Sequence, residues 1–319
     1  MVANVDKMFY VGAVPWHGLG TKLDKVATSA EAIAAAGLGW TVEKYPVFAQ
    51  TPEGMKQVPR SFAVTRSDNN APLGIVGDRY TPMQNKDAFS FFDSVVGVKE
   101  AMYHTAGSLG DGERIWILAK LPGYIQVAKN DIVDKYLLLA NTHNGTSSVE
   151  MLFSPVRVVC QNTLNMAIQG AKGDIAKARH TRGIMLKTDN IRESLKIVNY
   201  QYDIMEQASK KMVDKQMNQG HLEKYLEKIG LLRNVIEEDE ERRTTRSENI
   251  FNTMVNLFEH GKGNDMPEVR GTLWAGYNSV VEYVDYIRGN DKKRANSLLF
   301  GSGADIKQKA WDTAVAMIK

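Results

Sequence analysis

Residues 154–164 combine a short β-branched run, an arginine and a helix-starting sequence, which together could form a site for an anion. Residues 156–159 are all valine except for Arg157, and Gln-Asn-Thr follows shortly after them. Valine favours strands, whereas Asn and Thr favour the first positions of helices. An arginine inside an apolar strand costs free energy unless it faces water or an anionic partner. We therefore predict that Arg157 faces solvent or binds an anion.

A dense group of cations follows within residues 172–187, which we call the basic segment. Residues 151–235 carry 14 Lys and Arg against 8 Asp and Glu, although the net charge of the whole chain is only +3. A local positive excess attracts polyanions such as nucleic acid. The alternative is a solvated basic helix face. The basic side chains of this segment are Lys172, Lys177, Arg179, His180, Arg182 and Lys187.

Aromatic side chains could complete a nucleic-acid site by stacking on bases, each stack contributing about 1–3 kcal/mol. Tyr80, Trp116 and Tyr124 lie in β-like segments where one face could be open. Trp116 stands between two isoleucines, which predicts a core position. Tyr80, which follows an arginine, is the better candidate for exposure, and we add it to the predicted nucleic-acid-binding residues.

Metal and nucleophile motifs are not found in the sequence. The 6 histidines are scattered without HxH or HExxH spacing, and Cys160 is the single cysteine, expected to be a buried core residue. We predict no catalytic residue, no metal and no cofactor. An enzymatic alternative would assemble these side chains of the β-rich region: His104, Asp111, Glu113, His143 and Glu150.

Glycine-rich stretches offer weak evidence for phosphate binding. Residues 107–112 (GSLGDG) are expected to be a hairpin connection, whereas a phosphate cradle needs the amides of a helix start. Residues 301–303 (GSG) do precede a predicted helix that carries Lys307 and Lys309. That helix start is a weak candidate for anion binding.

The elements that would position these residues are strands first and helices later, which predicts an α+β fold. The expected architecture is an antiparallel-rich curved sheet with an interrupting helix, followed by a helical C-terminal part. Strict strand–helix alternation, typical of a doubly wound parallel sheet, is not seen. We expect an N-terminal arm and helix in residues 1–39, a β-rich core in 40–165 and a mainly helical part in 166–319.

Helix signals are clear in several places. Thr28 and Glu31 have the spacing of a capping box, and residues 85–96, 188–215 and 273–287 have apolar residues at helical spacing. The last of these helices carries Trp274 and Tyr277 on its apolar face, where we expect them to be core residues. The acidic run 237–241, followed by two arginines, is interpreted as a solvated helix surface or a linker.

Composition indicates a soluble protein of the cytosol. Hydrophobic residues make up 43% of the chain and charged residues 24%, values typical of a globular protein. The lone cysteine suggests a reducing compartment. No signal peptide and no apolar stretch long enough to span a membrane is found, so we expect no membrane partner.

Several motifs together resemble a known family. In chain order they are PWHGLGT (15–21), VRVVCQNTL (156–164), RHT (179–181), GTLWAGYNSVVEY (271–283) and FGSG (300–303). They resemble the phage/plasmid-like protein family, a domain-of-unknown-function family of phages, plasmids and prophages. The resemblance implies a mobile-element context and supplies no residue roles. The coarse layout is also similar to that of single-strand annealing proteins of the Rad52 and Red-beta type, which form rings or filaments.

From these observations we predict a phage or plasmid DNA-metabolism protein of the host cytosol. We expect it to bind single-stranded DNA, to form homo-oligomers and to act as a single-strand annealing recombinase. One alternative is an oligomeric structural or host-interaction protein that counters a host defence. The other is a nuclease or nucleotide-processing enzyme. No covalent chemistry is required by the first prediction.

Overall fold

The computed structural model describes residues 5–12, 20–96, 102–157, 162–163, 176–178, 180, 188–237, 240–289, 297–298 and 301–319. The chain divides into two compact units that interleave along the sequence. Unit 1 comprises Met1–Pro122, Tyr136–Phe153 and Asp174–Val198, and unit 2 comprises Gly123–Lys135, Ser154–Gly173 and Asn199–Lys319. The three parts expected from the sequence are each one continuous stretch, whereas each of these units is made of three separate stretches of the chain.

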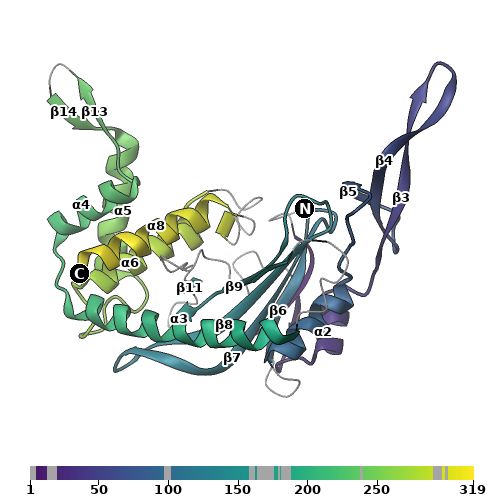
Figure 1. Ribbon diagram of the computed structural model, residues 1–319. Coiled ribbons are helices and arrows are strands. Elements are labelled where there is room, and N and C mark those ends of the chain that lie inside the picture. The colour runs from purple at the N-terminus through teal and green to yellow at the C-terminus, as the bar shows by residue number, and fades with distance from the viewer. Residues whose placement is uncertain are drawn as a thin grey trace. The chain divides into compact units, whose positions relative to one another are not determined.

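Strands and helices follow one another as shown in Figure 1. The strands are β1 (Val5–Val11), β2 (Thr21–Leu23), β3 (Val42–Thr51), β4 (Gly54–Arg66), β5 (Pro72–Gly77), β6 (Met102–Leu109), β7 (Arg114–Ala128), β8 (Asp131–Thr142), β9 (Val149–Phe153), β10 (Val156–Arg157), β11 (Asn162–Thr163), β12 (Ala176–Ala178), β13 (Asn234–Glu237) and β14 (Glu240–Arg243). The helices are α1 (Ser29–Ala35), α2 (Asn85–Val96), α3 (Thr188–Asp214), α4 (Gln219–Ile229), α5 (Thr245–His260), α6 (Leu273–Glu282), the π-helix η2 (Tyr283–Ile287) and α8 (Ser302–Met317).

The predicted α+β class is confirmed. The largest sheet has the strand order β11-β10-β8-β7-β6-β1-β2, with β9 beside β8 and β12 beside β9. Its pairings are antiparallel apart from the parallel contact between β1 and β2. Helix α2 interrupts the strands at the residues predicted for it, and the chain after β12 is mainly helical.

Unit 1 has a core between its helices and the strand β6. Thr28 caps α1 and forms the predicted capping box with Glu31, because each side chain accepts a hydrogen bond from the other residue's backbone N–H. Phe89 and Phe92 of α2 are fully buried and pack at ring-centroid distances of 5.2 and 6.0 Å from Tyr103 of β6. This packing holds α2 against β6.

A second, three-stranded sheet in unit 1 has the order β3-β4-β5. Strand β5 pairs only with Ser61–Thr65 of β4. The rest of β4 therefore continues with β3 alone as a two-stranded hairpin, which closes at the pair Thr51 and Gly54. Figure 1 shows this β3–β4 hairpin in dark blue, extending past the end of β5.

Unit 2 buries the aromatic residues predicted to be core. Trp274 and Tyr277 of α6 are fully buried, and Tyr277 also packs against Trp311 of α8. The indole Nε1 of Trp274 donates a hydrogen bond to Asp131 Oδ2 at 2.7 Å. This bond supplies the polar partner that a buried indole usually finds.

The acidic run of unit 2 does not form the helix surface or linker that we expected from its charge. Residues Asn234–Glu237 and Glu240–Arg243 pair as the antiparallel strands β13 and β14. The register places Glu237 opposite Glu240 and Val235 opposite Arg242. The apolar pair Val235 and Ile236 gives this segment its β-propensity, which the charge pattern concealed.

Candidate nucleic-acid interface

The predicted nucleic-acid-binding residues fall into three groups. Tyr80 and His180 are described with their side chains. The strands β10 and β12 contain Arg157 and Lys177, whose side chains lie outside the description. The remaining residues lie outside the described part of the chain: Lys172, Arg179, Arg182 and Lys187.

Tyr80 and His180 pack against each other in unit 1. Their rings stack with centroids 4.6 Å apart and planes at 27°. The Tyr80 hydroxyl donates a hydrogen bond to the carbonyl of Thr142 at 3.0 Å, and the Thr81 N–H donates to the carbonyl of His180 at 2.9 Å. Tyr80 is half-buried. Because the imidazole of His180 occupies one face of its ring, that face is not available for a base.

His180 is buried against Tyr80 and does not add charge to the basic segment. Its side chain is only 7% exposed, and neither ring nitrogen has a hydrogen-bond partner among the described residues. Burial lowers the pKa of His180, so the ring is neutral at pH 7. The imidazole therefore contributes packing on Tyr80, in contrast to the cationic role we expected.

Strand β12 provides a second attachment for the basic segment. Its residues pair with β9 in antiparallel register, with Lys177 opposite Glu150 and Ala178 opposite Val149. The backbone of the segment is thus tied to unit 1 on both sides of Arg179, by β12 before it and by His180 after it.

Arg157 lies in unit 2 and on a strand, as the sequence predicts. It occupies β10, where its register partners are Asn162 of β11 and Val133 of β8. The described part of the basic segment belongs to unit 1. Convergence of Arg157 with that segment stays a prediction.

The aromatic candidates differ in exposure. Trp116 is 5% exposed and is confirmed as a core residue. Tyr124 of β7 is 58% exposed, and Tyr200 of α3 is 65% exposed. Tyr124 is therefore the one of our three aromatic candidates that presents its ring to solvent.

A buried arginine that we did not single out is the centre of a polar network in unit 1. Arg66 of β4 is 3% exposed and makes a bidentate contact with Asp68 at 2.9 and 2.8 Å. Its Nη1 donates to Asp6 at 2.8 Å and to the carbonyl of Asp111 at 2.6 Å. Burial works to lower the pKa of Arg66, but hydrogen bonds to the two carboxylates outweigh it and raise that pKa.

The same network contains a buried histidine. The guanidinium of Arg66 lies 4.4 Å above the ring of Trp40, whose other neighbour is His143 at a ring-centroid distance of 5.2 Å. His143 Nε2 lies 3.0 Å from Asn85 Oδ1, and Nδ1 has no partner among the described residues. Burial, followed by the charges of His180 and Arg66, lowers the pKa of His143 to about 3. His143 is therefore a neutral core residue at pH 7.

The side chains of the enzymatic alternative occupy different surroundings. The ring of His104 packs edge-on against Tyr136 at 5.3 Å. Glu113 accepts a hydrogen bond from the Asp111 N–H through its carboxylate and from the His143 N–H through its carbonyl. The ring of His143 turns instead toward Asn85. Within the described ranges, no group of three or more His, Cys, Asp or Glu side chains could hold a metal ion.

At the weak candidate anion site at the start of α8, the first of the two lysines already forms an ion pair within the protein. Lys307 is fully buried and donates to Asp285 of η2 at 2.9 Å. Lys309 instead lines an open hollow of about 430 Å³ together with Lys228 and Asp312. Burial raises the pKa of Asp312. The hollow therefore mixes both signs of charge and is not a dedicated anion site.

Comparisons with known proteins identify a family and nothing more specific. A family model described as "Domain of unknown function (DUF932)" matches residues 72–311. No curated protein and no solved structure matches the chain. None of the described helices is long and apolar enough to cross a membrane.

Proposed function

We propose that this chain, which belongs to the DUF932 family of domains of unknown function, binds single-stranded nucleic acid through the basic segment of residues 172–187. The observation that supports the proposal is that the described residues of this segment, 176–178 and His180, pack in unit 1 by the pairing of β12 with β9 and by the stacking of His180 on Tyr80. A polyanion binds more tightly to cations that are already held together, because less conformational entropy is lost on binding.

Charge distribution supports a polyanion as the ligand. The excess of 14 basic over 8 acidic residues is confined to residues 151–235, in a chain of net charge +3. Each phosphate neutralised by a Lys or Arg releases counterions, which favours association at low salt. In this proposal Arg157, Lys172, Lys177, Arg179, Arg182 and Lys187 contact phosphates, and Tyr80 and His180 hold the segment.

A stacking platform is the second requirement of single-strand binding. Tyr124 is 58% exposed on a strand of unit 2. Strand aromatics with one open face are used by several single-strand binders to stack on bases, since every base offers a π-face. We assign the stacking role to Tyr124 in place of Tyr80, because His180 already occupies one face of the Tyr80 ring.

The proposal also includes self-association and a mobile-element context. Several copies would join their basic segments into one continuous track, which is what the annealing of two strands requires. The resemblance of the motifs described above supports a role in phage or plasmid DNA metabolism, and the coarse layout, similar to that of annealing proteins, supports single-strand annealing in the host cytosol. No bond is made or broken in this function.

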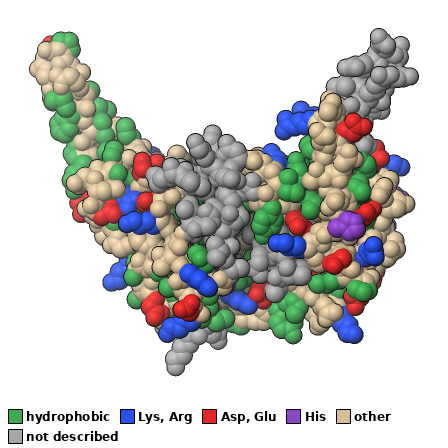
Figure 2. Space-filling view, turned by 180° about the vertical axis from the view of Figure 1, so that it is seen from behind, with side chains coloured by type: hydrophobic (Ala, Val, Ile, Leu, Met, Phe, Trp, Pro, Cys, Tyr) green, Lys and Arg blue, Asp and Glu red, His purple; other side chains and the backbone are tan. Residues whose placement is uncertain are grey.

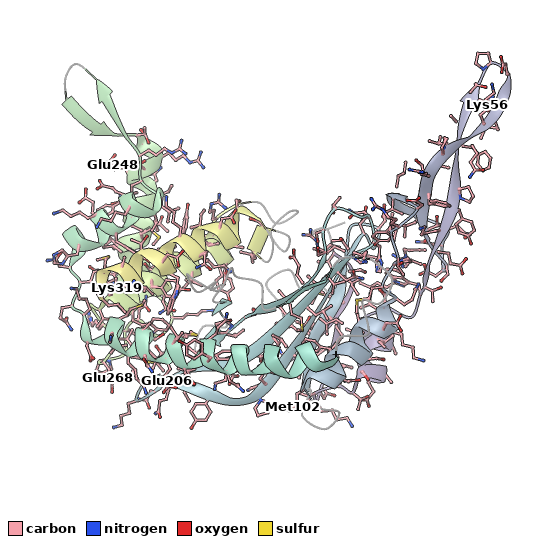
Figure 3. All side chains as sticks on the ribbon, viewed as in Figure 1. Lys56, Met102, Glu206, Glu248, Glu268 and Lys319 are labelled. Carbon is pink, nitrogen blue, oxygen red and sulfur yellow. The ribbon has the colours of Figure 1, made fainter. Side chains whose placement is uncertain are left out.

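Fluorescence anisotropy with labelled oligo-dT tests the proposal. Charge reversal by Arg179→Glu and Arg182→Glu is expected to weaken binding strongly and to flatten its salt dependence. The matched control is the pair Lys210→Glu and Lys224→Glu, two exposed cations of α3 and α4 outside the basic segment, where Glu206, the ion-pair partner of Lys210, is labelled in Figure 3. Equal losses in both pairs, or no binding by the wild type at low salt, would contradict the proposal.

A further inference from the structure

The outer edge of β3 is covered at its start and open farther along the hairpin. In the order β3-β4-β5, strand β3 lies at an edge. The side-chain amide of Gln84 covers the start of this edge, since it accepts from the N–H of Val42 and donates to its carbonyl, both at 2.9 Å. Pro46 follows and has no N–H to offer. Beyond Pro46, none of the described strands pairs with this edge of β3.

The turn of the hairpin determines which backbone groups face outward. Thr51 and Gly54 flank a two-residue loop, so they exchange hydrogen bonds with each other. The pair Ala49 and Lys56 does the same, because hydrogen-bonded pairs alternate along an antiparallel ladder. Phe48 and Gln50 must then direct their N–H and C=O groups away from β4. Such groups are a template for another extended strand.

The side chains at this edge are apolar or neutral. Phe48 is 49% exposed, and Met55, across from Gln50 in the ladder, is 61% exposed. No charged residue lies between Pro46 and Pro52. Figure 2 shows hydrophobic side chains along this hairpin, at the upper left. Natural edge strands usually carry charges that prevent pairing with another chain, and this part of β3 has none.

From these features we infer that the β3 edge pairs with the same edge of a second copy, antiparallel and centred on Ala49. This inference rests on the self-association included in the proposed function. In this register Phe48 exchanges hydrogen bonds with Gln50 of the second copy, and each of the four outward groups has a partner. The absence of charge favours self-pairing, because no like charges face each other and no charge selects a foreign strand.

Each of the two neighbouring registers leaves outward groups without a full set of partners. Centring the pair on Phe48 sets Gln50 opposite Pro46, and centring it on Gln50 sets Phe48 opposite Pro52; neither proline has an N–H. Centring it on Ala49 pairs Phe48 with Gln50 of the second copy, and both of these residues have an N–H and a C=O to offer. The two chains would then continue their small sheets across the two-fold axis.

A cysteine crosslink tests this register. At the centre of the pair the two Ala49 Cα atoms would be about 4.5 Å apart, because these residues exchange no hydrogen bonds. That separation is within the range a disulfide bridges. In a Cys160→Ser background, Ala49→Cys is expected to form a disulfide-linked dimer under mild oxidation. The control Ile75→Cys, on β5 and 66% exposed in the native protein, is expected to stay monomeric on a non-reducing gel.

A second variant separates edge pairing from simple apolar contact. Gln50→Pro removes an outward N–H and leaves the hydrogen bonds between β3 and β4 intact. In analytical ultracentrifugation it should therefore shift the protein from the mass of a dimer toward that of a monomer. Ile75→Lys should leave the mass unchanged. Equal crosslinking at positions 49 and 75, or an unchanged mass for Gln50→Pro, would overturn the inference. A wild type that stays monomeric at high concentration would overturn self-association as well, while leaving nucleic-acid binding to be decided by anisotropy.

Discussion

The ring of His180 stacks on the ring of Tyr80 at 4.6 Å, and this contact joins the basic segment to the loop between β5 and α2. Along the chain, the strands β6 to β12 of the large sheet lie between these two residues. The stack is supported by the Tyr80 hydroxyl, which donates to Thr142, and by the Thr81 N–H, which donates to His180. An aromatic pair of this kind contributes about 0.5–1.5 kcal/mol beyond its burial.

Removing the Tyr80 ring should loosen the basic segment. We expect Tyr80→Ala to make trypsin cut faster after Arg179 and Arg182, because the neighbouring His180 loses its packing partner. Tyr80→Phe keeps the stacked ring and loses only the hydrogen bond to Thr142, so it should remain close to the wild type. Limited proteolysis followed by mass spectrometry checks this. Identical cutting rates in Tyr80→Ala and wild type would contradict the role given to the stack.

Replacement of Arg66 should be destabilising. Its guanidinium is 3% exposed and neutralises the carboxylates of Asp6 and Asp68. Asp6 and Asp68 are themselves 21% and 40% exposed, so water would partly solvate the charges left behind. Arg66→Gln should still lower the urea midpoint of unfolding, because losing hydrogen bonds between charged groups costs about 1–3 kcal/mol. Arg79→Gln, at an exposed arginine, serves as the control and should change stability by less than about 0.5 kcal/mol. Equal midpoints for the two variants would show that the network is not needed.

Acid should weaken the fold through His143. Its folded pKa of about 3 lies below the unfolded value near 6.5, so the unfolded chain binds more protons between these values. The stabilisation is present above about pH 6.5 and is lost as the pH falls toward 3, with a slope of about 1.4 kcal/mol per pH unit between these values. His143→Asn should flatten that slope in urea titrations, whereas the exposed His221→Asn should not. A wild-type stability that is constant from pH 7 to 4 would contradict this account.

Lys307 offers a test of the buried pair in unit 2. Lys307→Met leaves Asp285 without its buried cation and should cost about 3–5 kcal/mol. The double variant Lys307→Met with Asp285→Leu removes both charges and should recover much of that loss. Lys309→Met, on the exposed face of α8, is the control. A double variant no more stable than the single one would argue against an uncompensated charge as the cause.

Tyr124 should contribute to binding through its exposed ring. We expect Tyr124→Ala to weaken oligo-dT binding by about 1–3 kcal/mol, the value of one base stack. Tyr200→Ala is the matched control, because Tyr200 is similarly exposed, at 65% against 58%, but lies on a helix. Anisotropy titrations of both variants check this. A larger loss for Tyr200→Ala would move the stacking role away from Tyr124.

Local sequence signals predicted the elements well. The helix at residues 85–96 coincides with α2, the capping box of Thr28 and Glu31 is present, and the 273–287 segment is helical, although its last turn is the π-helix η2. These features depend on residues a few positions apart. The acidic run was misinterpreted because its charges were weighed more heavily than the β-propensity of Val235 and Ile236.

Long-range contacts could not be predicted from the same signals. Arg66 and Asp6 are 60 positions apart, and no spacing rule connects them. The Arg-Ser-Asp order at 66–68 is the one local hint, since the bidentate contact is with Asp68. His180 looked like another cation because its neighbours are basic, whereas its burial against Tyr80 depends on the fold.

The most direct test of the account is the salt dependence of wild-type binding to oligo-dT. If the basic segment contacts phosphates, the logarithm of the binding constant should fall linearly with the logarithm of salt concentration. The slope for a single strand is about −0.7 for each phosphate neutralised. The account predicts a steep negative slope that becomes shallower in the Arg179→Glu and Arg182→Glu variant. A wild type whose binding is independent of salt, or absent at low salt, would contradict it.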